Sequence, residues 1–159
     1  MNTVPAGKNP RSTASIAGHP IHPMLIPFPV AFFVGAFATD LAFWRTGSEF
    51  FASAGVWLLG AGLVMAALAA VVGLIDFFGE SRIRALPAAW QHMIGNVILV
   101  LIEVFNLYRR LMDGDSAAIV PTGLALSAVA TLLLLFNGWM GWQMVYRHRV
   151  GISDQTTVR

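Results

Sequence analysis

The chain of 159 residues contains no cysteine. Disulfide bonds, thiolate metal sites, cysteine-ligated iron–sulfur clusters and covalent haem attachment through a CxxCH motif are therefore excluded. The sequence also lacks a glycine-rich phosphate loop, an HExxH zinc motif and a nucleophilic serine elbow. Any metal or haem must consequently be held by histidine, carboxylate or methionine, and no complete catalytic motif indicates an enzyme.

Charged residues are scarce as well. They make up 11% of the chain against 57% hydrophobic residues, and the mean hydropathy is +0.69. Such a composition is too apolar for a soluble domain of this size and indicates that the chain is surrounded mainly by membrane lipid. The net charge of +2 could suggest nucleic acid, but the ten lysines and arginines lie in polar breaks and tails. They form no helix-long basic stripe, so no nucleic-acid partner is expected.

Four apolar blocks are present, and each is long enough to cross a bilayer, which takes about 20 helical residues. Short breaks between the blocks force neighbouring helices to run antiparallel. The predicted fold is all-α, an integral membrane four-helix up-down bundle with short loops. The first helix is expected to begin near Pro27 to Pro29 and to end at Trp44; the other three cover residues 54–78, 92–111 and 120–146. The predicted divisions are a flexible N-terminal tail (1–18), the transmembrane domain (19–147) and a C-terminal tail (148–159).

Basic residues predict the orientation, because lysine and arginine are retained on the cytoplasmic side of a membrane. The face that carries both tails and the second loop holds seven of them, and the other face holds three. The seven are Lys8, Arg11, Arg82, Arg84, Arg147, Arg149 and Arg159, and the three are Arg45, Arg109 and Arg110. Both termini are therefore expected in the cytoplasm.

Prolines crowd the entrance to the first span, with four between residues 20 and 29. Proline lacks a backbone donor and disfavours helix at the preceding residue. His19 and His22 are therefore expected on extended or turn backbone at the membrane surface. Antiparallel topology places Asp76, at the end of the second span, and His92, at the start of the third, on the same face.

Imidazoles and one carboxylate suit zinc, iron, copper or nickel, and two imidazoles on opposite sides suit a b-type haem. His19, His22, Asp76 and His92 are the candidate ligands. A structural alternative remains open, in which the histidines of a proline-rich cap bond lipid phosphate or loop carbonyls. Asp76 could likewise form an ion pair with a nearby arginine, Arg82 or Arg84.

The third span carries a polar stripe at helical spacing. Its members are His92, Asn96, Leu99, Glu103, Asn106 and Arg110. Glu103 lies about 16 Å along the axis from His92, so it cannot reach water readily and should be protonated, paired or wetted from inside. Its candidate interior neighbours are Asn106, Arg109, Arg110 and Asp40. A structural role and a proton relay are both compatible with this pattern.

Several short motifs together resemble a known family. They are Gly18-His19-Pro20-Ile21-His22-Pro23-Met24-Leu25, Phe28-Pro29, Gly73-Leu74-Ile75-Asp76, Trp90-Gln91-His92-Met93-Ile94-Gly95-Asn96 and Asn106-Leu107-Tyr108-Arg109. The chain resembles, over roughly residues 18–147, the uncharacterised bacterial membrane proteins grouped as domain of unknown function 2231. Relatives in that family are joined to Rieske-type or c-type cytochrome domains, so the resemblance implies a redox setting.

The preferred hypothesis is a small protein of the bacterial inner membrane that binds a metal or b-type haem near its cytoplasmic face. His22 and His92 would be the ligands, with His19 and Asp76 as further ligands or supporting groups. The site would pass electrons between a membrane carrier and a redox protein partner.

Two other hypotheses stay open. The chain could be a non-catalytic membrane anchor or a subunit of a larger membrane complex, with the polar stripe serving helix packing. It could instead move ions or protons through Glu103, Asn106 and Asp40.

Overall fold

The computed structural model describes residues 8–154, so residues 1–7 of the predicted N-terminal tail and residues 155–159 of the predicted C-terminal tail lie outside the described residues. The long helices are α2 (Pro27–Thr46), α3 (Glu49–Gly79), α5 (Pro87–Asp113) and α6 (Leu124–Trp142). The short helices are α1 (Ile21–Leu25) and α4 (Ser81–Arg84), the π-helical turns are η1 (Ile119–Gly123) and η2 (Gln143–Arg147), and the strands are β1 (Ser15–Ile16) and β2 (His19–Pro20).

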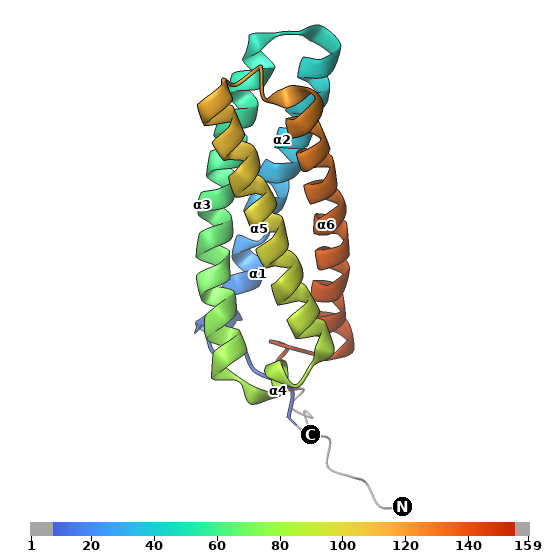
Figure 1. Cartoon of the computed structure of the whole chain (residues 1–159). Coiled ribbons are helices and arrows are strands. Elements are labelled where there is room, and N and C mark those ends of the chain that lie inside the picture. Colours follow the sequence, from blue (N-terminus) through green and yellow to red (C-terminus); the bar gives the residue numbers. More distant parts are fainter. Residues whose placement is uncertain (1–7, 155–159) are drawn as a thin grey trace, which may run out of the picture.

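The four long helices form an antiparallel bundle (Figure 1). α2 packs on α3, α3 on α5, α5 on α6 and α6 on α2. The α2–α3 and α5–η1 connections lie at one end of the bundle, and α4 lies at the other end (Figure 1). The β1–β2 hairpin lies at the α4 end, where the segment that precedes it contacts the last turn of α3. The predicted all-α four-helix bundle is therefore confirmed.

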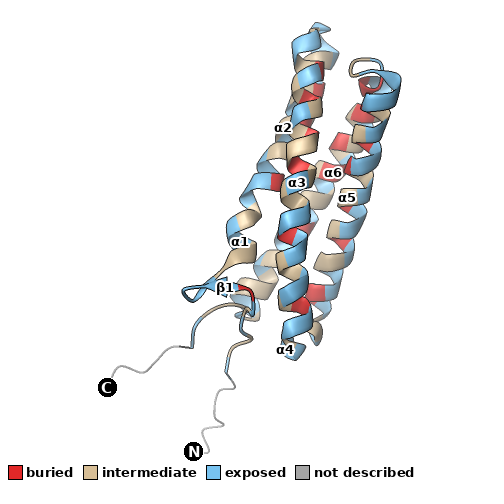
Figure 2. Ribbon diagram, turned by 90° about the vertical axis from the view of Figure 1, so that its left-hand side faces the viewer, coloured by how far each residue is buried: buried red, intermediate tan, exposed pale blue. Residues whose placement is uncertain are grey.

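The surface of the bundle is apolar and its interior holds polar groups. Within residues 8–154, four helices are long and apolar enough to cross a membrane, at 21–46, 49–79, 87–113 and 119–147. Buried residues lie along the inner sides of the helices, and exposed residues cover the outer sides (Figure 2). Large apolar side chains such as Trp57, which is 80% exposed, point outward. Lipid is the solvent that such a surface requires, so the chain is a membrane protein.

An apolar layer crosses the bundle between its two ends. Phe33 and Ala36 of α2, Leu59 of α3 and Leu99 of α5 meet there, and all four are buried. Gly62 allows this packing, because a Cβ atom at its position would lie 2.5 Å from the Phe33 ring. In lipid, where dispersion forces drive helix association, such small residues let helices approach closely.

The backbone at the entrance of the first span differs from the prediction. His19 lies on extended backbone in β2, but His22 lies inside α1 rather than on extended or turn backbone. The prolines permit this, because Pro23 is in the first turn of α1 and Pro27 begins α2. The first turn of a helix has unpaired N–H groups in any case, so proline costs no hydrogen bond there.

Two connections are shorter than predicted. Gly47, in the left-handed conformation at φ 66°, and Ser48 alone separate α2 from α3, which begins at Glu49 rather than at residue 54. Pro87 starts α5 five residues before the predicted position. The extra turns extend the helices beyond their most apolar segments, which is why hydropathy underestimates their length.

Replacing Gly62 with alanine is expected to lower the thermal unfolding midpoint in detergent. The new methyl group must displace the Phe33 ring, and overpacking of this kind costs about 1–3 kcal/mol. Gly60→Ala is the matched control, because a Cβ at Gly60 meets nothing within 4 Å. The control should keep or slightly raise the midpoint; equal midpoints for both variants would contradict the close approach at Gly62.

Candidate functional site

Two histidines face each other in the half of the bundle near α4. His22 Nδ1 lies 2.8 Å from the Ala69 carbonyl of α3, and His92 Nδ1 lies 3.0 Å from the Asn137 carbonyl of α6. A carbonyl can only accept, so each Nδ1 carries the proton and each Nε2 keeps its lone pair. The ring centroids are 6.3 Å apart and the ring planes meet at 83°.

A glycine lies directly against each of the two imidazole rings. A Cβ at Gly73 of α3 would lie 2.9 Å from His22 Cε1, so no larger residue fits there without a shift. A Cβ at Gly141 of α6 would lie 3.5 Å from His92 Cε1, which is ordinary contact. Four different elements, α1, α3, α5 and α6, therefore hold the pair.

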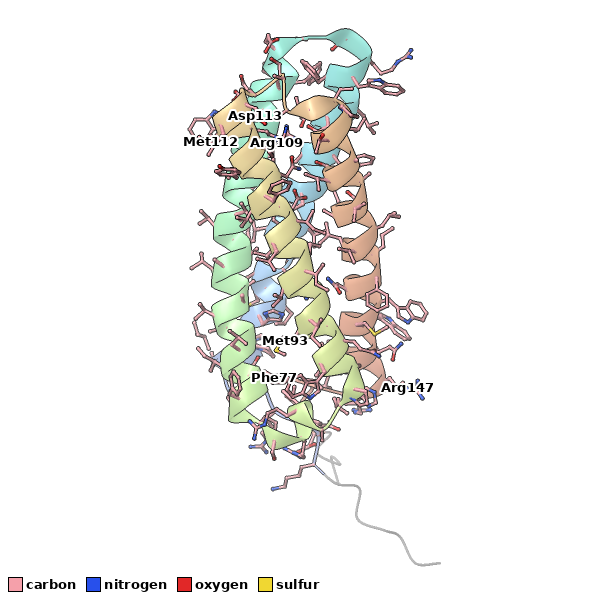
Figure 3. All side chains as sticks on the ribbon, in the orientation of Figure 1. Phe77, Met93, Arg109, Met112, Asp113 and Arg147 are labelled. Atoms are coloured by element: carbon pink, nitrogen blue, oxygen red, sulfur yellow. The ribbon has the colours of Figure 1, made fainter. Side chains whose placement is uncertain are left out.

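The two histidines line a cleft of about 370 Å³. Its walls are mainly apolar, and Phe77 and Met93 approach it from α3 and α5 (Figure 3). Val97 and Leu101, which also line it, are 55% and 63% exposed on the outer surface of α5. The cleft therefore opens sideways toward lipid, between α3 and α5.

The other two predicted ligands differ in position: Asp76 lines the same cleft as the pair, whereas His19 does not. His19 is exposed, and its Nδ1 lies 3.0 Å from the Ala17 carbonyl. The Asp76 carboxylate accepts hydrogen bonds from Ser12 Oγ, at 2.9 Å to both oxygens, and from the backbone N–H of Ala14 at 2.7 Å. Across residues 8–154 no three histidine, aspartate or glutamate side chains gather closely enough to hold a metal ion.

Asp76 instead fastens the start of the described chain to the bundle. Thr13 Oγ1 also donates to it at 3.2 Å, and a Cβ at Gly79 would lie 2.5 Å from that hydroxyl oxygen. Residues 8–18, which belong to the predicted tail, thus contact the end of α3. No periodic pattern in the sequence predicts the contact between this segment and Asp76. The hydroxyl groups of the Ser12-Thr13 dipeptide are the one sign of possible hydrogen-bond donors.

A second polar network occupies the other half of the bundle. Asp40, Glu103, Asn106, Arg110 and Ser127 have no exposed surface. Asp40 Oδ2 accepts from Arg110 Nη2 and from Ser127 Oγ, both at 2.7 Å. Asn106 Nδ2 donates to Glu103 Oε2 at 3.1 Å and to Ser127 Oγ at 2.9 Å, while its Oδ1 accepts from Arg110 Nε at 3.3 Å.

Three charged or ionisable side chains of this network have an unused polar atom. Asp40 Oδ1, Glu103 Oε1 and Arg110 Nη1 are buried without a hydrogen-bond partner among the described residues. Gly55 and Gly123 make room for the guanidinium, since a Cβ at either would lie 2.8 Å from Arg110 Nη1 or 3.3 Å from Nη2, respectively. The network is tightly enclosed and incompletely satisfied.

Arg109, predicted in the interior, lies at the surface instead. It forms an ion pair with Asp113, and the two side chains are 36% and 43% exposed (Figure 3). Arg110 is the interior arginine, because it continues the line of Asn106 one helical turn later. Helix geometry explains this difference from the prediction. Position 109 lies one residue before Arg110 and is therefore rotated about the helix axis, away from the stripe.

The apolar layer divides the stripe of α5 into two parts. On the histidine side, Asn96 Nδ2 donates to the His92 carbonyl at 2.8 Å and Asn137 Nδ2 lies 3.4 Å from Asn96 Oδ1. Leu99 then separates this part from Glu103. The stripe alone does not identify Asn137 or Ser127, because both come from α6.

Comparison with known proteins adds the family. A family model described as a predicted membrane protein, DUF2231, matches residues 18–154. No curated protein and no solved structure matches the chain. The matched range includes both histidines and all of the second network.

Asp40→Asn is expected to lower the free energy of unfolding by about 3–5 kcal/mol, because it leaves the Arg110 cation buried without a countercharge. Asp113→Asn makes the same chemical change in the exposed pair with Arg109 and should cost about 0–1 kcal/mol. Thermal unfolding of both variants in one detergent gives the comparison. Similar losses would mean that burial of the Asp40 pair is not what stabilises the bundle.

Proposed function

The chain belongs to the DUF2231 family of predicted membrane proteins, and from this premise we propose that its bundle binds a b-type haem, or a transition-metal ion, between His22 and His92. The bound group would serve electron transfer in the membrane. The observation that carries the proposal is the facing pair of imidazoles, each with its Nδ1 bonded to a backbone carbonyl.

The spacing of the rings supports one ion between them. Each imidazole would hold such an ion through one ring nitrogen at about 2.0 Å. The centroids of His22 and His92 are 6.3 Å apart, which leaves room for one ion between the rings.

The number of ligands favours haem over a bare ion. Two imidazoles leave most metal ions short of ligands, and no third histidine or carboxylate joins the pair within residues 8–154. A haem would need only two ligands from the protein, which His22 and His92 would supply. The cleft volume of about 370 Å³ lies at the lower end of the range of about 300–1,000 Å³ for ligand sites, so part of an apolar macrocycle would extend through the cleft opening toward lipid.

Held by His22 and His92, the bound group would supply one-electron transfer rather than substrate binding. The chain would hold both rings in place through the Ala69 and Asn137 carbonyls, which also raise the basicity of each Nε2. Apolar walls such as Phe33 and Phe77 would keep water from the site.

The proposed orientation follows from the charges at the histidine end. Lys8, Arg11, Arg82 and Arg84 gather there, whereas Arg110 at the opposite end is buried in an ion pair and adds no surface charge. The positive-inside rule then places the histidine end at the cytoplasmic side of a bacterial inner membrane. A lipid-soluble carrier or a redox protein would be the electron partner.

Titration of purified protein with haemin is expected to give a Soret band of a six-coordinate species that saturates at one haem per chain. His22→Ala and His92→Ala should each abolish that species, because each removes one axial nitrogen. His19→Ala is the matched control, since His19 is exposed and lies apart from the pair, and it should bind haem as the unmodified chain does.

The opposite result identifies the other class of function. A chain that binds neither haem nor a stoichiometric transition metal, but co-purifies in mild detergent with a larger complex, would be a non-catalytic membrane subunit. Equal haem binding by all three histidine variants would also refute the proposed site.

A further inference from the structure

The second network contains more negative than positive groups. Asp40 and Glu103 can each carry a negative charge, Arg110 carries one positive charge, and none of the three has exposed surface. Lipid surrounds this part of the bundle, so an unbalanced charge inside it is strongly disfavoured. One carboxyl group must therefore be neutralised.

The contacts show which carboxyl group that is. Asp40 Oδ2 forms the ion pair with the Arg110 guanidinium and also accepts a hydrogen bond from Ser127. Glu103 Oε2 accepts a hydrogen bond only from the uncharged amide of Asn106, at 3.1 Å, and Oε1 is buried without a partner among the described residues. A proton on Oε1 leaves Oε2 as the acceptor that Asn106 requires.

We propose that Glu103 is a proton-binding site in the interior of the membrane domain, and that it exchanges its proton with the α5–η1 end of the bundle. The site does not depend on the haem proposal, because the two networks are separate. A bound metal cation fits less well, because Arg110 Nη1 is an additional buried donor in the same cluster and would repel it.

The groups around Glu103 come from all four long helices. α2 contributes Asp40, α5 contributes Asn106 and Arg110, and α6 contributes Ser127. α3 faces the network with Gly55, which has no side chain to titrate. The charges of Asp40 and Arg110 cancel in their ion pair. The net charge of the network therefore changes when Glu103 gains or loses its proton.

Within residues 8–154, the hydrogen-bonded groups around Glu103 lie toward one end of the bundle. Asn106 Nδ2 donates to Glu103 and to Ser127, Ser127 donates to Asp40, and Asp40 pairs with Arg110, three residues before the end of α5 at Asp113. On the opposite side, the apolar layer around Leu99 separates Glu103 from the histidines. Among the described residues, the polar groups around Glu103 therefore lie toward the α5–η1 end, so its proton is expected to exchange on that side.

Infrared spectroscopy can detect the bound proton directly. The chain has three glutamates, Glu49, Glu80 and Glu103, so carbon-13 labelling of glutamate alone gives a simple spectrum. Glu49 is exposed, and hydrogen bonds from Arg82 lower the pKa of Glu80 to about 2. At pH 7 the labelled C=O band of a protonated carboxyl should therefore come from Glu103 alone.

Glu103→Gln should remove that band and keep the bundle folded, because a glutamine has nearly the shape of a neutral glutamic acid. Glu49→Gln is the matched control and should leave the band unchanged. A spectrum of the unmodified chain without a protonated glutamate band at pH 7 would overturn the proposal, and so would a band that persists in folded Glu103→Gln protein.

The direction of exchange is tested by a pair of asparagine variants. After transfer to D₂O, the Glu103 band should shift several-fold more slowly in Asn106→Leu, which interrupts the connection, than in the unmodified chain. Asn96→Leu, on the other side of Leu99, should shift at the unmodified rate. Ser127→Ala is a smaller interruption for use if Asn106→Leu does not fold. A slower shift in Asn96→Leu alone would overturn the proposed direction.

Discussion

The ion pair between Asp40 and Arg110 joins α2 to α5, which lie diagonally opposite each other in the bundle. No apolar contact in lipid could fix that diagonal so specifically, because lipid tails are as apolar as leucine. The pair has a definite geometry and a large penalty for separation. Ser127 of α6 bonds the same oxygen of Asp40, and Gly55 of α3 gives the guanidinium its space, so all four long helices take their register from this contact.

The helix register that the ion pair sets at one end of the bundle also affects how the helices pack at the other end. Below the ion pair, Leu99 and Phe33 close the interior, and the helices then separate enough to leave the cleft between α3 and α5. At the cleft, α5 presents His92 and Asn96, whereas α3 presents the small residues Gly73 and Ala69. Polar groups thus lie on both sides of an apolar layer, so one bundle can contain a redox site and a proton site that share no hydrogen bond.

The four spans, their antiparallel order and the polar stripe of α5 were predictable because lipid penalises every polar side chain on a helix and restricts it to one face. The residues of other helices that bond to this stripe were not predictable. Ser127 and Asn137 are single polar residues of α6, and nothing in the sequence pairs them with α5. Helical spacing does separate Arg110, which continues the stripe, from Arg109, which does not. His22 differs from the prediction because Pro23 lies in the first turn of α1, where a helix tolerates proline.

Asp76, one of the predicted ligands, supports the histidine pair through the backbone. Its carboxylate holds Ser12 and the N–H of Ala14, and the Ala14 carbonyl in turn accepts from the N–H of Ile21, the first residue of α1. His22 is the next residue. The position of its ring therefore depends on two supports, the Ala69 carbonyl on Nδ1 and the segment that Asp76 fastens to α3. A residue at the end of α3 thus helps to fix the distance between two imidazoles held by four elements, which explains why a carboxylate lies beside the histidine cleft with both of its oxygens already bonded.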